Sequence, residues 1–138
     1  MESDDGAFSI PVRVYLEDTD AQGVVYNAGY FRFMERARTE WLQARGIGHR
    51  LLEEQYGIAL VLTETTAKFL APAVQGDDLA VSARVTVFRG ARVVFEQTVR
   101  READNEILCA GTAEVACKRI GSGRPTRWPE TLAKELTS

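Results

Sequence analysis

Hydrophobic and polar residues alternate over residues 10–17, and this period of two predicts a first β-strand. From residue 27 to residue 45 the apolar positions recur instead every three or four residues, as in an amphipathic α-helix with one buried face. Gly46 is a natural stop for that helix. A second, shorter helix is expected over residues 49–56, closed by Gly57.

Alternation returns in the second half of the chain and predicts four more strands, over residues 58–70, 79–87, 93–99 and 107–118. Short turn signals separate these four strands, at residues 75–78, 89–92 and 103–106. Consecutive strands joined by such short turns must be antiparallel. The sequence therefore predicts an α+β domain in which one antiparallel sheet of five strands packs on one long helix.

The chain is expected to contain a flexible N-terminal arm, residues 1–9, and a single domain, residues 10–138. The length of 138 residues is typical of one domain. Within that domain, residues 121–138 have the composition of a polar tail, with room for one last helical turn.

Composition excludes several classes of function. A net charge of −3 offers no basic surface for nucleic acid, and no apolar run approaches the ~18 residues needed to cross a membrane. The acidic N-terminus lacks the features of a signal peptide, so the expected compartment is the cytoplasm.

No metal site is expected, because His49 is the only histidine and the two cysteines are not a close pair. Cys109 and Cys117 lie in one predicted strand, roughly 26 Å apart and so beyond disulfide reach. Both are expected to be buried as small hydrophobic residues. His49 itself is expected at the surface or at a helix cap.

The stretch EDTDAQGVVYN, residues 17–27, places two acids between the first strand and the long helix. In one interpretation Asp18 and Asp20 only form a turn, which aspartate favours because it bonds nearby N–H groups. In the other, a carboxylate beside the helix N-terminus attacks a carbonyl carbon or activates water, while the helix N–H groups hold the oxyanion. Gly23 would let the backbone approach a ligand. This second arrangement suits acyl transfer to water.

Residues 12–42, VRVYLEDTDAQGVVYNAGYFRFMERARTEWL, resemble the Tol–Pal-associated acyl-CoA thioesterases. These enzymes are part of the hotdog-fold superfamily that includes 4-hydroxybenzoyl-CoA thioesterase. The resemblance continues through AKFLAPAVQGDDL, FRGARVVFEQ and RPTRWPETL and so covers nearly the whole chain. It implies a hotdog fold, in which a five-stranded antiparallel sheet wraps around one long central helix.

The resemblance also implies roles for single residues. Asp20 matches the catalytic carboxylate, and the backbone N–H of Asn27 matches the donor that polarises the thioester carbonyl. Asp18 is interpreted as structural, organising the loop. The substrate-binding residues implied in the same block are Gly23, Val25 and Tyr26.

Asn27 departs from the family, which usually has histidine at this position. Asparagine donates and accepts hydrogen bonds but does not titrate near neutral pH. If the histidine relays a proton, activity in this protein should be weaker or follow another pH profile; if it only orients groups, Asn27 can serve. Alternatively, Asn27 is simply the helix N-cap.

Coenzyme A carries three phosphates, so cations are expected at the mouth of the site. Arg89 and Arg92 are the candidates in the FRGAR turn, with Lys118 and Arg119 as further ones. The alternative is an ordinary charged turn. Coenzyme A belongs to the substrate, so no cofactor is expected.

The predicted function is hydrolysis of a small or medium acyl-CoA to the free acid and coenzyme A, by a homo-oligomer that is a dimer or a dimer of dimers. An isolated sheet would leave edge strands exposed, which dimerisation can pair. Three alternatives stay open. The first is a dehydratase or hydratase, whose chemistry usually needs an aspartate and a histidine together, although His49 is poorly placed to help. The others are a catalytically weak protein that binds acyl-CoA or acyl-carrier protein, and a partner-binding role beside the envelope machinery.

Overall fold

The computed structural model describes residues 8–137. In this part of the chain five strands form one sheet, in the order β1-β3-β4-β5-β2, and all neighbours are antiparallel. The strands are β1 (Phe8–Arg13), β2 (Ile58–Phe69), β3 (Asp78–Arg89), β4 (Arg92–Arg101) and β5 (Ile107–Arg119). The predicted α+β class and the antiparallel sheet of five strands are confirmed.

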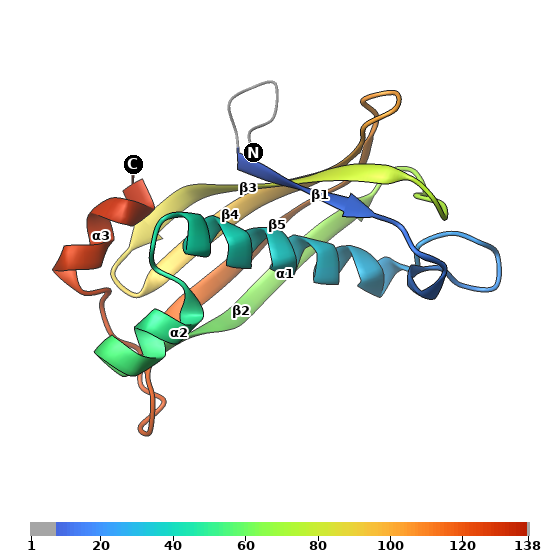
Figure 1. The fold of residues 1–138 in the computed structure, drawn as a ribbon. Coiled ribbons are helices and arrows are strands. Elements are labelled where there is room, and N and C mark those ends of the chain that lie inside the picture. Colours follow the sequence, from blue (N-terminus) through green and yellow to red (C-terminus); the bar gives the residue numbers. More distant parts are fainter. Residues whose placement is uncertain (1–7, 138) are drawn as a thin grey trace.

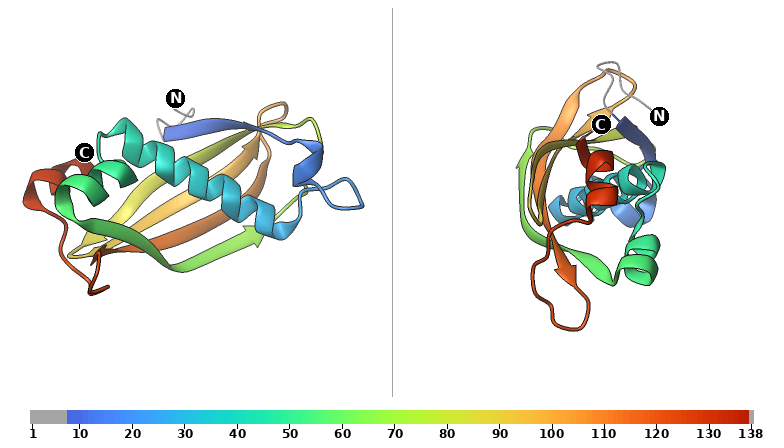
Figure 2. Two further views of the ribbon diagram at one scale, coloured as in Figure 1. Left: turned by 60° about the horizontal axis from the view of Figure 1, so that its bottom comes forward. Right: turned by 90° about the vertical axis from the view of Figure 1, so that its left-hand side faces the viewer.

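Helix α1 (Asn27–Ala44) lies along the concave face of the sheet, which curves around it (Figures 1 and 2). Its apolar stripe faces the strands because residues three and four apart share one side of a helix. The ring of Trp41 meets that of Phe95 on β4 edge to face, with centroids 5.4 Å apart. Phe33 and Ala37 are completely buried against the sheet. The long central helix is thus confirmed within one residue of its predicted end.

The first strand begins and ends earlier than the alternation predicted. Phe8 and Ser9, assigned to a flexible arm, pair with Ala83 and Ser82 of β3, while the rest of that arm lies outside the described residues. The strand stops at Arg13, and Leu16–Asp18 form a 3₁₀ turn, η1. The carboxylate of Asp18 accepts the N–H of Tyr15 at 2.8 Å and closes this turn, which alternation alone does not reveal.

The short second helix is confirmed as α2 (His49–Leu51) followed by a wider turn, η2 (Leu52–Tyr56). Gly57 ends it in the left-handed conformation, with φ of 64°. The expected polar tail is wrong in part, because Glu130–Thr137 form a helix, α3, whose Leu132 and Leu136 are buried. Two leucines four residues apart give this helix an apolar stripe that covers one end of the core.

Candidate functional site

The acidic stretch folds into a small hairpin at the start of α1 (Figure 1). Thr19 pairs with Val25, and the N–H of Asp20 donates to the carbonyl of Val24 at 2.9 Å. The chain reverses through Gly23, whose φ of 81° lies in the region that favours glycine. The hairpin therefore holds Asp20 beside the residues that lead into the helix.

Asp20 is exposed, and its carboxylate is oriented by its own turn. Oδ1 accepts the backbone N–H of Gln22 at 2.8 Å and, more weakly, that of Val24 at 3.5 Å. Among residues 8–137, both hydrogen bonds to this carboxylate are accepted by Oδ1. Oδ2 is therefore free to contact water or a substrate. The turn-forming and chemical interpretations of Asp20 are compatible, because they use different oxygens.

Asp18 is buried, with 6% of its surface exposed, and has a different environment from Asp20. Besides the Tyr15 N–H, it accepts a hydrogen bond from the guanidinium of Arg32 on α1 at 3.4 Å. The Arg32 guanidinium carbon lies 5.6 Å from the centre of the Tyr26 ring, so it contacts both flanks of the hairpin. These contacts support the structural interpretation of Asp18.

Asn27 is the first residue of α1, and the N-cap position belongs to Tyr26. The alternative interpretation of Asn27 as the N-cap is therefore wrong, and its side chain is exposed at the helix start. The first N–H groups of a helix have no carbonyl partner within the helix and carry the positive end of its dipole. The N–H of Gly29 donates to the carbonyl of Tyr26 at 2.8 Å, so the two N–H groups before it, those of Asn27 and Ala28, are the ones at the very start of the helix.

The other two substrate-binding candidates in this block occupy unlike environments. Tyr26 is 37% exposed and lies on the surface beside Asn27, where a ligand can reach it. Val25 is 4% exposed and belongs to the core instead of an open surface. Its side chain lies against Gly29, so its effect on a ligand would pass through the position of the hairpin.

A loop for which the sequence predicted only a turn lies against the acidic hairpin. Residues 71–77, called the strap here, connect β2 with β3. The N–H of Val25 donates to the carbonyl of Ala73 at 2.9 Å, and Val24 pairs with Val74. The N–H of Ala73 donates in turn to the hydroxyl of Tyr30 on α1 at 3.0 Å. Burial raises the pKa of Tyr30, so its hydroxyl stays protonated.

Aromatic residues of β2 and α1 meet next to this end of the helix. The ring of Phe69 lies 5.7 Å from that of Tyr30 and 6.2 Å from that of Phe31, measured between centroids. Phe69 is still 43% exposed and Leu70 is 58% exposed. Together they form an apolar surface beside the helix start, of the kind that an acyl chain can contact.

Arg89 and Arg92 lie at the other end of the sheet from Asp20. They are opposite each other where β3 turns into β4, with Gly90 at the bend. The twelve-residue β3 spans roughly 36 Å and separates them from the strap. Arg92 is paired with Glu114, and this contact lowers the pKa of Glu114. One chain therefore does not bring these arginines to the acidic hairpin.

His49 also lies away from the hairpin, because it follows the C-terminal end of α1 (Figure 1). It is exposed, as predicted. A dehydratase that combined Asp20 and His49 of one chain is inconsistent with this placement.

Cys109 and Cys117 are free and fully buried, which confirms their prediction as small core residues. Residues 8–137 contain no group of three or more histidine, cysteine, aspartate or glutamate side chains placed to hold a metal ion. Within the same range no helix is both long and apolar enough to cross a membrane.

Comparison with known proteins identifies the class to which this fold and hairpin belong. Residues 14–136 match the family described as the thioesterase-like superfamily. The chain is 31% identical to a probable thioesterase from Bartonella henselae, whose crystal structure it matches with a TM-score of 0.83 over 89% of this chain and 99% of that one. The chain belongs to the thioesterase-like superfamily, and it is an enzyme with the hotdog fold.

Two further similarities concern the sequence and the fold. It is 40% identical to the acyl-CoA thioesterase YbgC of Haemophilus influenzae, over 93% of each chain. It also matches the fold of a 1,4-dihydroxy-2-naphthoyl-CoA thioesterase from Synechocystis, with a TM-score of 0.88, 23% identity and coverage of 96% and 97%. The family that the motif suggested is confirmed, whereas its association with Tol–Pal and its cytoplasmic location stay predictions.

Proposed function

We propose that this protein hydrolyses the thioester of a small or medium acyl-CoA, releasing the free acid and coenzyme A. The observation that carries the proposal is the geometry of Asp20, whose Oδ1 is held by its own turn and whose Oδ2 is open. A fixed carboxylate beside a helix N-terminus suits attack on a carbonyl carbon. The similarity to YbgC, named an acyl-CoA thioesterase, supports acyl-CoA as the substrate class.

In the proposed reaction Oδ2 of Asp20 removes a proton from water as the water oxygen attacks the thioester carbon. The carbonyl oxygen becomes an oxyanion, which the backbone N–H of Asn27 and the helix dipole stabilise. The C–S bond then breaks, and the thiolate of coenzyme A takes the proton from Asp20. Direct attack by the same oxygen, through an anhydride, would use the same geometry.

Asp20→Asn is the sharpest test, because asparagine keeps the Oδ1 acceptor of the turn and removes only the charge. Thiol release would be measured from acetyl-, hexanoyl-, palmitoyl- and benzoyl-CoA. Loss of a base of this kind should lower kcat by about 10²- to 10⁴-fold. Glu17→Gln is the matched control, since Glu17 is an exposed acid in the adjoining turn and should keep normal activity. Equal activity of Asp20→Asn and wild type would reject the proposal.

The alternative function is an acyl-CoA or acyl-carrier-protein binding protein with little catalysis. It is favoured by Asn27, at a position where the family resemblance implies a histidine. Wild-type protein that binds acyl-CoA in calorimetry, but releases no thiol from any member of the panel, would support this alternative.

We also infer that the working enzyme is a homo-oligomer joined through β2. This strand lies at the edge of the sheet, and its exposed apolar side chains include Val61, Leu62 and Phe69. Twelve residues of uncovered edge strand invite pairing with another chain. A second copy would bury both the backbone edge and the apolar side chains.

Such pairing would also explain Arg89 and Arg92. If two β2 strands pair antiparallel around a two-fold axis, each sheet is reversed relative to the other. The β3–β4 turn of one copy then lies at the same end of the double sheet as the acidic hairpin of its partner. The arginines would meet coenzyme A phosphates only in the assembly.

Leu62→Glu tests this assembly, because it puts a charge on the β2 edge. Sedimentation should show wild type at two or four times the chain mass. The variant should sediment as a smaller species, since its β2 edges repel each other, and its thioesterase activity should fall with the assembly. Val87→Glu is the control, because it puts the same charge at a position of similar exposure on β3, a strand that does not lie next to β2. A monomeric, active wild-type protein would contradict the inference.

A further inference from the structure

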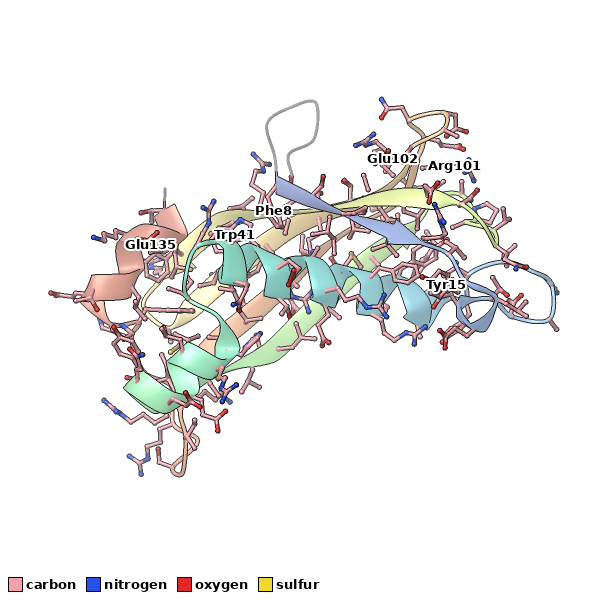
Figure 3. The ribbon with its side chains drawn as sticks, viewed as in Figure 1. Phe8, Tyr15, Trp41, Arg101, Glu102 and Glu135 are labelled. Carbon is pink, nitrogen blue, oxygen red and sulfur yellow. The ribbon has the colours of Figure 1, made fainter. Side chains whose placement is uncertain are left out.

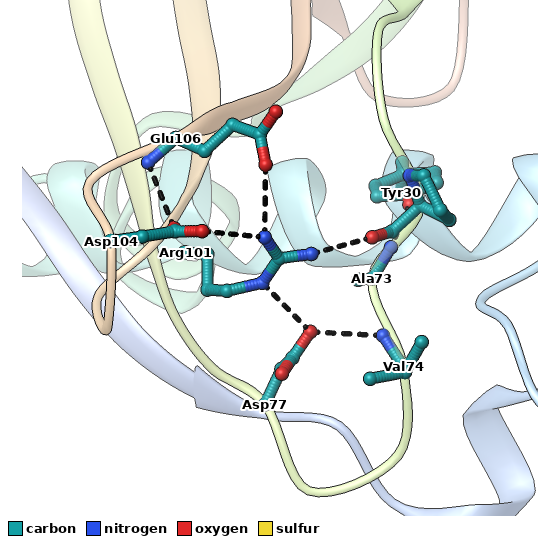
Figure 4. Close-up of polar contacts among 8 residues, drawn as sticks. Tyr30, Ala73, Val74, Asp77, Arg101, Asp104 and Glu106 are labelled. Carbon is teal, nitrogen blue, oxygen red and sulfur yellow. Dashed lines mark hydrogen bonds and ion pairs between the residues drawn. The ribbon is translucent and has the colours of Figure 1, made fainter.

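Arg101, the last residue of β4, lies at the centre of a polar cluster beside the strap (Figures 3 and 4). Its Nε donates to Asp77 at 3.2 Å, and one terminal nitrogen donates to both Asp104 and Glu106 at 3.0 Å. The other terminal nitrogen donates to the carbonyl of Pro72 at 2.8 Å. All three guanidinium nitrogens are thus used, and the side chain is only 18% exposed.

The partners of Arg101 belong to two segments, the strap and the β4–β5 turn. Pro72 and Asp77 are close to the two ends of the strap, so a single side chain holds both of them. The planar guanidinium of arginine makes this fork, whereas the ammonium of lysine is a compact charge on one atom. Asp77 passes the contact on, because its Oδ2 also accepts the N–H of Val74 at 2.9 Å.

The strap holds the acidic segment at both of its ends. At the entry, the N–H of Val14 donates to Asp77 O at 2.9 Å, and the N–H of Gly76 donates back to Val14 O at 2.9 Å. At the exit, Val25 bonds to Ala73 and Val24 pairs with Val74. Val24 is also the residue whose carbonyl accepts the N–H of Asp20. Hydrogen bonds and the short backbone segments between them therefore connect Arg101 with the hairpin.

We propose that Arg101 is a positioning residue for Asp20, acting through the strap at a distance from the substrate. This inference rests on the proposed role of Asp20. Without the fork, Pro72 and Asp77 lose their common partner, and the hairpin loses the rigid support against which Val24 and Val25 pair. Misplacement of a reacting group by about 1 Å can cost as much as 10²-fold in rate.

Arg101→Gln and Arg101→Lys would be compared with wild type at a temperature well below unfolding. Arg101→Gln should lower kcat by about ten- to a hundredfold while KM changes by less than about threefold, since the substrate contacts stay in place. Arg101→Lys keeps the charge but loses the fork, so its kcat should lie between those of wild type and Arg101→Gln. Arg84→Gln is the matched control, because Arg84 also lies on the sheet and pairs with one carboxylate, Glu96, far from the strap.

Amide hydrogen exchange provides a second readout that does not depend on catalysis. In Arg101→Gln, peptides covering residues 14–27 and 71–77 should exchange faster, while β5 keeps wild-type protection. Wild-type exchange in both segments, or equal loss of kcat in Arg84→Gln, would overturn the proposal.

The two readouts also separate this proposal from the proposed function. Faster exchange around residues 14–27, combined with full activity of Asp20→Asn, would support the path from Arg101 and reject Asp20 as the catalytic group. If Arg101→Gln exchanges as slowly as wild type while Asp20→Asn loses activity, the proposed thioesterase function is supported and the positioning role of Arg101 is rejected.

Discussion

Gly29 and Val25 pack so closely that the structure has no space for a side chain at position 29. A Cβ added to Gly29 would lie 2.9 Å from Cγ1 of Val25. Real Cβ atoms essentially never come this close to another heavy atom, so one of the two residues would have to move. The glycine, which looks unfavourable inside a helix, lets the start of α1 lie directly on the acidic hairpin.

Gly29→Ala should therefore destabilise the protein, although replacing glycine with alanine inside a helix normally increases the free energy of unfolding by about 1 kcal/mol. Overpacking of a filled core typically costs about 1–3 kcal/mol. The free energy of unfolding would be measured in urea. Val25→Ala removes the conflicting methyl groups, so the double variant should be no less stable than Val25→Ala alone. If the double variant loses as much free energy of unfolding as the two single variants combined, the close contact is contradicted.

Asp18→Ala should show that Asp18 and Asp20 have different roles, the first in stability and the second in catalysis. It leaves the Tyr15 N–H and Arg32 without their buried acceptor, which should cost about 1–3 kcal/mol in the free energy of unfolding. Asp18→Asn keeps an oxygen for Tyr15 and should lose less. In contrast, Asp20→Asn should alter the stability little, because Asp20 is exposed. A stable Asp18→Ala variant would contradict the structural role of Asp18.

Asn27→His should restore the residue typical of the family at the helix start. The new histidine would titrate below its ordinary pKa of about 6.5, because the positive end of the helix dipole disfavours its cationic form. If that residue relays a proton, the pH profile of kcat should gain an inflection in this range, and activity above it should rise. Asn27→Gln, which cannot titrate, is the control. An unchanged profile in Asn27→His would mean that position 27 acts only through its backbone.

The buried cysteines should make stability fall at alkaline pH. Burial raises the pKa of Cys109 and of Cys117 from 9.0 to about 11. The unfolded chain therefore loses these protons first, and the free energy of unfolding decreases as the pH rises from about 9 to about 11, by up to about 1–3 kcal/mol per thiol. Below about pH 9 the contribution is complete.

A variant with alanine at both cysteines should lose less stability between about pH 8 and about pH 10 than wild type does, as measured by urea denaturation. Tyr30, whose pKa is also raised by burial, remains in both proteins and does not affect the comparison. Equal pH dependence of the two proteins would contradict the assignment to the thiols.

Local sequence patterns predicted most of the elements. The spacing of Tyr30, Met34, Ala37 and Trp41 indicated α1, because each of these residues is buried on one helix face. Alternation indicated the strands after residue 57, and the short turn at Gly90 required β3 and β4 to be antiparallel. The motif around Asp20 predicted the family, which the comparisons confirm. Such signals are local, since they depend on residues within a few positions of each other.

The sequence was less reliable where one residue overrides a local pattern. Val14 and Leu16 continue the alternation of β1, yet Asp18 bends the chain into η1. Likewise, the tail has a polar composition, but Leu132 and Leu136 find a place on the core once the sheet has formed. In both cases the deciding contact is a single hydrogen bond or a small apolar surface that composition does not reveal.

By itself the sequence determined the class of fold, the position of the long helix, the family and the candidate carboxylate Asp20. Only the tertiary structure decided that Asp18 is buried and Asp20 exposed, that Arg89 and Arg92 lie at the far end of the sheet, and that Arg101 supports the hairpin. Arg101 and Pro72 are 29 positions apart in the chain and meet because β3 and β4 pair in register. Periodicity records which face of an element is buried, whereas contacts of this range depend on how the elements pack together.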